Sequence, residues 1–296
     1  MTLQKPFLKW VGGKTQIIGD IINKIPSKIN NYHELFLGGG SILLAVLSLQ
    51  RDNKIEIKEK VYAYDLNESL INVYNNIKFK KNELYDSINE LWSTYDSING
   101  NIINRNPNNI DDAKTSKESY YYWIRKKYNE IDNNTVEHSA MFIFLNKMGF
   151  RGLYREGPNG FNVPYGHYKK TPQMLSKDDL NNINDLIKDV EFQCLDFNDS
   201  ISKVKKDDFI YLDPPYAPET GTSFVGYTKD GFDLESHIKL FNKIKSKKHI
   251  KFVMNNAKVD LVMEHFNDYN YEDIIARRAI NSKNPESITT EVIIYN

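Results

Sequence analysis

The chain has 296 residues, of which 40% are hydrophobic, 26% charged and 12% aromatic. This composition excludes disorder throughout, because disordered chains lack the apolar and aromatic side chains that fill a core. The 39 Lys and Arg residues balance the 39 Asp and Glu residues, so no overall basic excess marks a nucleic-acid-binding protein. The single cysteine, Cys194, excludes an internal disulfide and a zinc site built from several cysteines.

Targeting and membrane segments are not evident in the sequence pattern. No apolar run approaches the ~20 residues that span a bilayer, and the opening MTLQKPFLKW lacks the apolar core of a signal peptide. The sequence therefore predicts a soluble, cytoplasmic protein.

Strand-like and helix-like patterns alternate over the first ~80 residues, as they do in α/β folds. We expect strands at 32–37 and 61–64 and helices at 14–25 and 67–78. A strongly apolar helix follows the Gly38-Gly39-Gly40 loop, and the Ser41 hydroxyl is expected to be its N-cap.

The pattern changes between residues 80 and 172. Polar helices are expected at 83–98 and 116–128, with an Asn-rich connection between them, and no strand alternates with them. Residues 141–172 combine five basic residues with one acidic residue and several aromatic rings: Lys147, Arg151, Arg155, Lys169 and Lys170 against Glu156, with Tyr154, Phe161, Tyr165 and Tyr168. A local basic, aromatic segment suits a phosphate backbone even in a neutral chain.

Alternation returns after residue 176. Strands are expected at 191–197, 208–212, 250–254, 271–276 and 291–295, and helices at 233–246 and 259–266. We predict one α/β domain with a Rossmann-like sheet, built from residues 1–79 and 173–296 and interrupted by a helical insertion at 80–172. Ligands of such a sheet bind at the carboxyl ends of its strands.

The first motif at such a position is the glycine loop. Glu34-Leu35-Phe36-Leu37 leads into Gly38-Gly39-Gly40, and the next strand ends at Asp65. Glycines let the backbone approach a ligand closely, and an acid ~20 residues further on can accept hydrogen bonds from ribose hydroxyls. A tight turn alone would explain the glycines, but the pair of features indicates an adenosine-type cofactor, as in dehydrogenases and methyltransferases.

The second motif, Asp213-Pro214-Pro215-Tyr216, follows the buried-looking strand at 208–212. Two prolines remove two backbone donors and leave an acceptor-rich corner of the Asp213 carboxylate and the Pro214 carbonyl. An exocyclic amine offers two donors to such a corner, and Tyr216 offers a flat face for a base. A proline-rigidified turn is the alternative, and the neighbouring glycine loop and Asp65 disfavour it.

Other chemistries fit less well. Val11-Gly12-Gly13-Lys14-Thr15 resembles a phosphate-binding loop, but Leu8 stands where that motif needs glycine, so we do not expect an NTPase. The six histidines form no metal-binding pair, and no metal site is expected. Cys194 lies in a strand-like run and is interpreted as a core residue rather than a nucleophile.

Together these motifs resemble Dam-like DNA adenine N6-methyltransferases of the α group (D12 class). The resemblance rests on Lys9-Trp10-Val11-Gly12-Gly13-Lys14, Phe36-Leu37-Gly38-Gly39-Gly40 and DPPY, in the order of that group. It extends to residues 146–155 and 160–166 of the insertion, with one departure: Arg151 stands where the family commonly has Asn.

The resemblance implies S-adenosyl-L-methionine as cofactor and assigns roles to particular residues. The cofactor would be bound by Trp10, Lys14, Phe36, Gly38, Gly40, Asp65 and Asp213. Catalysis would depend on Asp213, Pro214 and Tyr216. Double-stranded DNA would be contacted by Lys9, Arg151, Arg155, Pro164 and Tyr168, and arginine commonly reads guanine.

The sequence thus predicts a methyltransferase that acts on N6 of a flipped-out adenine in double-stranded DNA, with GATC as the commonest target of such enzymes. A restriction–modification setting with an endonuclease partner and a monomeric state are further expectations. Two alternatives stay open: an amino-methyltransferase acting on RNA or protein, and a DNA-binding module that has lost catalysis.

Overall fold

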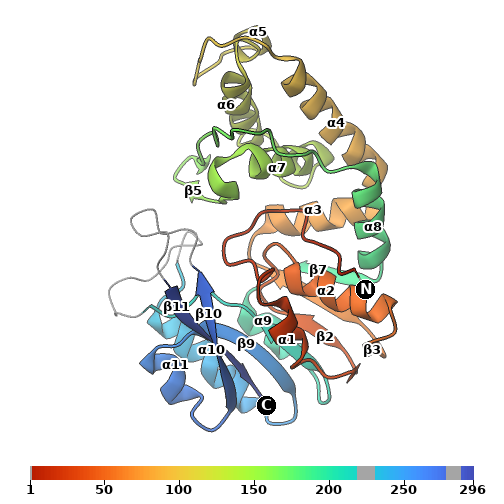
Figure 1. Cartoon of the computed structure of the whole chain (residues 1–296), viewed down its shortest axis with the longest axis vertical. Coiled ribbons are helices and arrows are strands. Elements are labelled where there is room, and N and C mark those ends of the chain that lie inside the picture. Colours follow the sequence, from red (N-terminus) through yellow and green to blue (C-terminus); the bar gives the residue numbers. More distant parts are fainter. Residues whose placement is uncertain (1, 219–230, 278–287) are drawn as a thin grey trace.

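The computed structural model describes residues 2–218, 231–277 and 288–296, and within them a seven-stranded sheet forms the centre of the protein (Figure 1). The strand order is β10-β11-β9-β8-β2-β4-β7. β11 is antiparallel to both neighbours, and all other neighbouring strands are parallel. The strands are β2 (Tyr32–Glu34), β4 (Val61–Asp65), β7 (Val190–Cys194), β8 (Phe209–Leu212), β9 (Lys251–Ala257), β10 (Asn270–Arg277) and β11 (Ile288–Tyr295). The predicted α/β sheet is confirmed.

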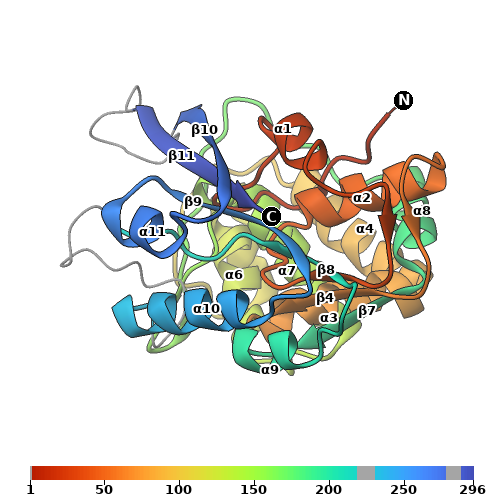
Figure 2. The same cartoon turned by 90° about the horizontal axis from the view of Figure 1, so that it is seen from below.

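Helices cover both faces of this sheet (Figure 2). Alternate residues of a strand point to opposite faces, so Phe209 and Tyr211 of β8 join one core cluster while Ile210 and Leu212 join the other. The first cluster includes residues of α1 (Ile18–Ile22), α2 (Ser41–Arg51), α3 (Glu68–Phe79) and α8 (Lys177–Ile187). The second includes residues of α9 (Phe197–Ser202), α10 (Leu234–Ser246) and α11 (Asp260–His265). β1 (Lys28–Ile29) and β3 (Glu56–Ile57) form a separate parallel pair.

Residues 80–172 add no strand to the central sheet. They form α4 (Lys81–Ser97), α5 (Ile110–Ala113), α6 (Lys117–Tyr128), α7 (Val136–Met148), the 3₁₀ turn η1 (Phe150–Gly152) and the strands β5 (Glu156–Gly157) and β6 (Gly160–Phe161). Figure 1 shows these elements above the carboxyl ends of the parallel strands. The helical character of this segment is as expected, but its sequence pattern did not reveal the short antiparallel pair β5–β6.

Several expected element boundaries are wrong. Ser41 is the first helical residue of α2, because Gly40 takes the N-cap position in a left-handed conformation (φ 67°). The strand expected at 191–197 ends at Cys194, because the Asp196 side chain accepts a hydrogen bond from Asn198 N and begins α9. Cys194 is exposed and not a core residue.

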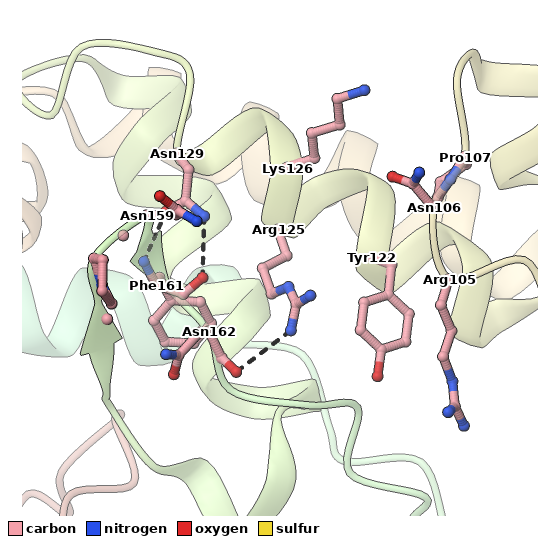
Figure 3. Close-up of a pocket in the computed structure, with 13 residues that line it drawn as sticks. Arg105, Asn106, Pro107, Tyr122, Arg125, Lys126, Asn129, Asn159, Phe161 and Asn162 are labelled. Atoms are coloured by element: carbon pink, nitrogen blue, oxygen red, sulfur yellow. Dashed lines mark hydrogen bonds between the residues drawn. The ribbon is translucent and has the colours of Figure 1, made fainter.

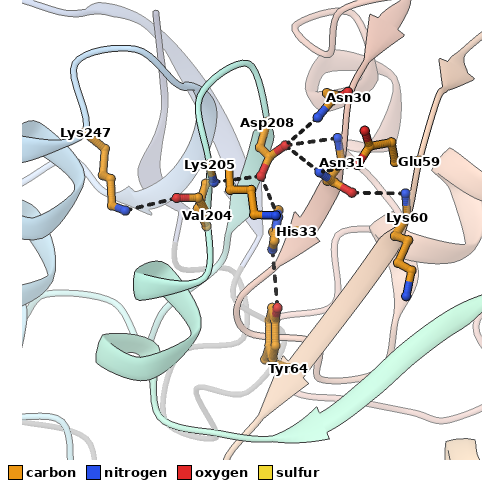
Figure 4. A network of polar contacts seen from close by, with 10 residues as sticks. All are labelled: Asn30, Asn31, His33, Glu59, Lys60, Tyr64, Val204, Lys205, Asp208 and Lys247. Atoms are coloured by element: carbon orange, nitrogen blue, oxygen red, sulfur yellow. Dashed lines mark hydrogen bonds and ion pairs between the residues drawn. The ribbon is translucent and has the colours of Figure 1, made fainter.

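A buried polar network fixes the opposite, amino ends of β2 and β8 (Figure 4). One carboxylate oxygen of Asp208 accepts hydrogen bonds from Asn31 Nδ2 (2.8 Å) and Asn30 Nδ2 (3.2 Å), and the other lies 3.2 Å from His33 Nε2. Burial favours a higher pKa of Asp208, but the hydrogen bond that Lys205 N donates to Oδ2 (2.8 Å), together with those from Asn31 and Asn30, holds the pKa below its usual value. The network lies at the amino ends of the strands, away from the loops that follow their carboxyl ends.

Among the helices that the structure describes, none has the combination of length and apolar character that crossing a membrane requires.

Candidate active site

Three neighbouring strands end in acidic residues at the same edge of the sheet. Glu34 ends β2, Asp65 ends β4 and Asp213 directly follows β8, and these strands are adjacent in the order β8-β2-β4. Parallel strands place their carboxyl ends together, so the glycine loop and the DPPY corner become neighbours although they lie far apart in the sequence.

Asp213 forms an ion pair with Lys14, whose Nζ lies 2.6 Å from Oδ2. Lys14 is only 4% exposed and also donates to the Gly12 carbonyl. Burial raises the pKa of Asp213, and the Lys14 ammonium opposes that rise. The second oxygen, Oδ1, is buried and has no hydrogen-bond partner among the described residues. A buried acceptor without a partner is costly, so this oxygen is available to a ligand that donates.

Three residues that were not predicted from the sequence contact the DPPY corner through polar groups. The Tyr216 hydroxyl donates to Glu291 Oε2 (2.9 Å), and Ala217 N donates to Asn256 Oδ1 (2.9 Å). The Pro215 carbonyl lies 3.0 Å from His237 Nε2. Asn256 comes just after the predicted strand at 250–254, and polar residues at that position were the signal that could have found it. Glu291 and His237 carry no comparable signal.

The glycine loop is shaped by Asp65 and Trp10. Asp65 Oδ2 accepts a hydrogen bond from Gly38 N (2.9 Å) and Oδ1 accepts one from Asn67 N (2.9 Å). Gly38 has φ 50°, and a Cβ there would lie 2.8 Å from Trp10 Cδ1. A carboxylate has about four lone-pair directions, so Asp65 keeps acceptor capacity after these two bonds. Asp65 therefore fixes the turn that the glycines make, a role beyond the predicted one.

The other residues predicted for the cofactor surround this loop. A Cβ on Gly40 (φ 67°) would lie 2.4 Å from the buried hydroxyl of Tyr74, which has no hydrogen-bond partner among the described residues. The ring of Phe36 packs against Phe197 at 6.3 Å and edge-on to Phe232 at 6.1 Å. Phe36 thus packs between the loop and α9 and is half-buried there.

The residues predicted to contact DNA are divided between two places. Lys9 Nζ lies 3.3 Å from the Tyr168 hydroxyl and 4.3 Å from the centre of its ring. Tyr168 in turn donates to the Gly149 carbonyl (2.7 Å), and Phe150 N donates to Pro164 O (2.8 Å). Lys9, Pro164 and Tyr168 are therefore brought together around the turn that contains Arg151.

Arg151 and Arg155 are both exposed. Arg151 has a left-handed backbone (φ 56°), and its guanidinium lies 5.2 Å from the Phe150 ring centre. Arg155 donates from Nε to Asn162 Oδ1 (2.6 Å). Arg155 therefore lies with the β5–β6 pair rather than with the Lys9 group.

Trp10 connects this part of the protein to the glycine loop. Its indole stacks on Tyr154 (5.8 Å between centres) and on Phe142 of α7 (6.4 Å). The same indole contacts Gly38, so a single side chain touches both the loop at the sheet edge and the 80–172 segment.

A basic groove of about 350 Å³ lies between α6 and the β5–β6 pair (Figure 3). Its lining includes Arg105, Arg125 and Lys126 and no acidic residue. The Arg125 guanidinium lies 4.6 Å from the Tyr122 ring centre and donates to Val163 O (3.1 Å). These residues lie outside the basic segment at 141–172 and were not predicted; the run Arg125-Lys126-Lys127 was the signal that could have found them.

No cluster of His, Cys, Asp and Glu side chains able to hold a metal ion occurs within residues 2–218, 231–277 and 288–296.

The fold agrees with comparison to known families. Residues 10–280 match the model of the D12 class N6 adenine-specific DNA methyltransferases, and the chain belongs to that family. It is thus an adenine-specific DNA methyltransferase by family, and such an enzyme requires a methyl donor.

Individual relatives are similar over nearly the whole chain. The type II methyltransferase M.MjaIII of Methanocaldococcus jannaschii is 37% identical, with 94% of this chain and 93% of the relative covered. The type II methyltransferase M1.LlaDCHI of Lactococcus lactis subsp. cremoris is 30% identical (99% and 95% covered). The DNA adenine methylase of Haemophilus influenzae is 31% identical (95% and 89% covered).

Proposed function

We propose that the protein transfers a methyl group from S-adenosyl-L-methionine to N6 of a flipped-out adenine in double-stranded DNA. The observation that carries this proposal is the DPPY corner, where Lys14 binds one oxygen of Asp213 and the other is buried with no partner in the part of the chain that the structure describes. Such an oxygen requires a hydrogen-bond donor, and an exocyclic amine supplies one.

The residues at the sheet edge fit the proposed cofactor. S-adenosylmethionine supplies an electrophilic methyl group when it is bound. Asp65 retains acceptor capacity for ribose hydroxyls, and the left-handed glycines leave no Cβ between the loop and a ligand. Trp10, Lys14, Phe36, Gly38, Gly40, Asp65 and Asp213 are the residues proposed to bind it.

The proposed chemistry depends on hydrogen bonding to the target amine. Asp213 Oδ1 and the Pro214 carbonyl accept hydrogen bonds from the two N–H groups of the target amine. These bonds draw the nitrogen lone pair out of conjugation with the ring. Tyr216 stacks on the base, and its hydrogen bond to Glu291 fixes the ring plane. Lys14 stabilises the ionised form of Asp213, which is the form that accepts.

We propose that residues 80–172 form the target-recognition domain and that residues 1–79 and 173–296 form the catalytic domain. The position of α4–α7 above the carboxyl ends of the strands supports this division (Figure 1). Lys9, Arg151, Arg155, Pro164 and Tyr168 would contact bases or phosphates. The groove lined by Arg105, Arg125 and Lys126 fits phosphates, since no acidic residue lines it, although Arg105 also pairs with Glu118 (2.7 Å).

GATC is the proposed site, on the resemblance of the recognition segments. Two relatives are named type II methyltransferases, which favours a restriction–modification setting with an endonuclease partner. We propose a monomeric enzyme that acts on cellular DNA in the cytoplasm.

The test is transfer of labelled methyl groups from S-adenosylmethionine into duplexes that contain GATC or a scrambled site. Wild type is compared with Asp213→Ala and with Asp199→Ala, which removes an exposed carboxylate on α9. We expect transfer to the GATC adenine, lost in Asp213→Ala and retained in Asp199→Ala.

Other outcomes separate the alternatives. Transfer to the scrambled duplex would discard the proposed site and keep the reaction. Transfer only to RNA or to a glutamine peptide would overturn the DNA substrate. Tight duplex binding without transfer to any substrate would identify a silent DNA-binding module.

A further inference from the structure

The side chain of Asn146 pairs with the backbone of Lys9 in both directions. Lys9 N donates to Asn146 Oδ1 (2.9 Å), and Asn146 Nδ2 donates to Lys9 O (2.7 Å). Asn146 belongs to α7 and is 4% exposed. The amide thus fixes both backbone polar groups of Lys9, its N–H and its carbonyl.

The same amide also holds the turn that carries Arg151. Asn146 Nδ2 donates a second bond to Gly152 O (3.3 Å). Gly152 lies so close to Lys9 that a Cβ on it would be 2.3 Å from Lys9 Cβ. The turn and the Lys9 backbone therefore cannot shift independently, because both contact each other and share the Asn146 amide.

The side chain of Lys9 and the backbone that follows it lead to different sites. The Lys9 side chain reaches Tyr168, among the residues proposed to contact DNA. The next residue, Trp10, contacts the glycine loop, and Lys14 pairs with Asp213. Asn146 therefore lies at the junction between the proposed DNA surface and the proposed cofactor site.

We propose that Asn146 is a positioning residue that couples DNA binding to cofactor binding, an inference that rests on the proposed function. A duplex that orders the turn at 149–153 also orders the Lys9 backbone through Asn146, and with it the segment that leads to Trp10 and Lys14. Such coupling is reciprocal, so each ligand tightens the other by the same factor, typically 5- to 150-fold.

The experiment measures this factor without turnover. The Kd of a fluorescent GATC duplex is measured by anisotropy with and without saturating S-adenosylhomocysteine, and the Kd of S-adenosylhomocysteine by calorimetry with and without duplex. We expect wild type to show mutual tightening of at least about fivefold. In Asn146→Asp, which loses both Nδ2 donors, the factor should fall to about one.

Asn76→Asp is the matched control. Asn76 is also a buried asparagine whose Nδ2 donates two bonds to the α7 region, to Thr135 O (3.2 Å) and Ser139 Oγ (2.8 Å), but it does not contact Lys9. It should lose stability and keep the coupling factor. Asn146→Ser, which is neutral but too short to reach Lys9, replaces Asn146→Asp if that variant does not fold.

The outcomes are distinct from those of the proposed function. Equal coupling in wild type and the Asn146 variants, or no coupling in wild type, would overturn the inference while methyl transfer to DNA still stands. Loss of coupling in Asn76→Asp as well would assign the effect to general destabilisation and overturn it too. A wild type that neither binds nor methylates any duplex would remove the proposed function itself, and the inference with it.

Discussion

Lys14 Nζ lies 2.6 Å from Asp213 Oδ2, and the two residues come from segments far apart in the sequence. Burial alone would favour the protonated carboxyl, and the nearby Glu291 carboxylate adds to that effect. The ammonium opposes both and occupies only one of the two carboxylate oxygens. The arrangement therefore combines an ion-paired carboxyl oxygen with a second, buried oxygen that has no hydrogen-bond partner among the described residues.

Replacing Lys14 should change both the rate and its pH dependence. Lys14→Met removes the positive charge that lowers the pKa of Asp213, so this pKa should rise further. Because the proposed acceptor is the ionised carboxylate, the acid limb of kcat against pH should move to higher pH. The rate at neutral pH should fall by about a hundredfold or more, as for loss of a preorganised charge in other active sites. Single-turnover methyl transfer between pH 5 and 9 measures both effects.

Lys5→Met removes a lysine outside the site and is the control for loss of charge alone. An unshifted acid limb in Lys14→Met, with the fold intact, would contradict the assigned role of the ion pair.

The basic groove leads to a prediction about salt. Lys126 lines the groove, and its side chain forms no hydrogen bond or ion pair within the described part of the chain, whereas the side chain of its neighbour Lys127 pairs with Glu130 (2.9 Å). If Lys126 contacts a DNA phosphate, Lys126→Gln should reduce the slope of log Kd against log salt by about one. Lys127→Gln should leave the slope unchanged. Titrations of one duplex at several salt concentrations give these slopes. Equal slopes for both variants would contradict a contact between Lys126 and a DNA phosphate.

The sheet was predictable because strand-like and helix-like patterns alternate on both sides of the 80–172 segment. Asp65 and Asp213 follow short apolar runs, and parallel pairing alone places them at one edge. The exact boundaries were less accessible. Gly40 rather than Ser41 caps α2, because only the glycine adopts φ 67° without strain. The apolar pattern of the helix does not predict that backbone conformation.

The contacts around the site were predictable only in part. DPPY identifies an acceptor corner, but its supports, Glu291 and His237, come from separate elements and make contacts that no local pattern encodes. Likewise Asn146 belongs to a motif that the sequence analysis quoted, yet its pairing with Lys9 depends on how α7 packs against the amino-terminal segment. Long-range pairing of this kind requires the fold itself.

Arg151 illustrates a departure that the backbone explains. It stands where the resembling family commonly has Asn, and its φ of 56° is one that Asn tolerates better than Arg. Arg151→Asn should therefore increase the free energy of unfolding, by about 0.5–1 kcal/mol. Urea denaturation measures the change, and Arg155→Asn, at an exposed position without positive φ, is the control. A less stable Arg151→Asn would show that contacts of the Arg151 side chain outweigh the backbone strain.

Glu34 at the end of β2 should make the stability of the protein fall as pH rises. Burial raises its pKa to about 8 from an ordinary value of 4.5, and it accepts a hydrogen bond from the Tyr32 hydroxyl (2.7 Å). Between these two values the folded protein holds a proton that the unfolded chain releases, so the free energy of unfolding decreases with pH. Between pH 5 and pH 8 the ionisation of Glu34 should lower the free energy of unfolding by on the order of 3 kcal/mol.

Glu34→Gln keeps an oxygen that can accept from Tyr32 but cannot ionise, so it should lose this part of the pH dependence and be more stable than wild type at pH 8. Urea denaturation at pH 5, 6.5 and 8 is the measurement. Glu83→Gln, at an exposed position on α4, should retain the slope of wild type. Parallel slopes for wild type and Glu34→Gln would mean that Glu34 is ionised in the folded protein at neutral pH. A buried Glu34 carboxylate would then act on Asp213, and the Lys14 ammonium would have to offset this charge as well as the effect of burial.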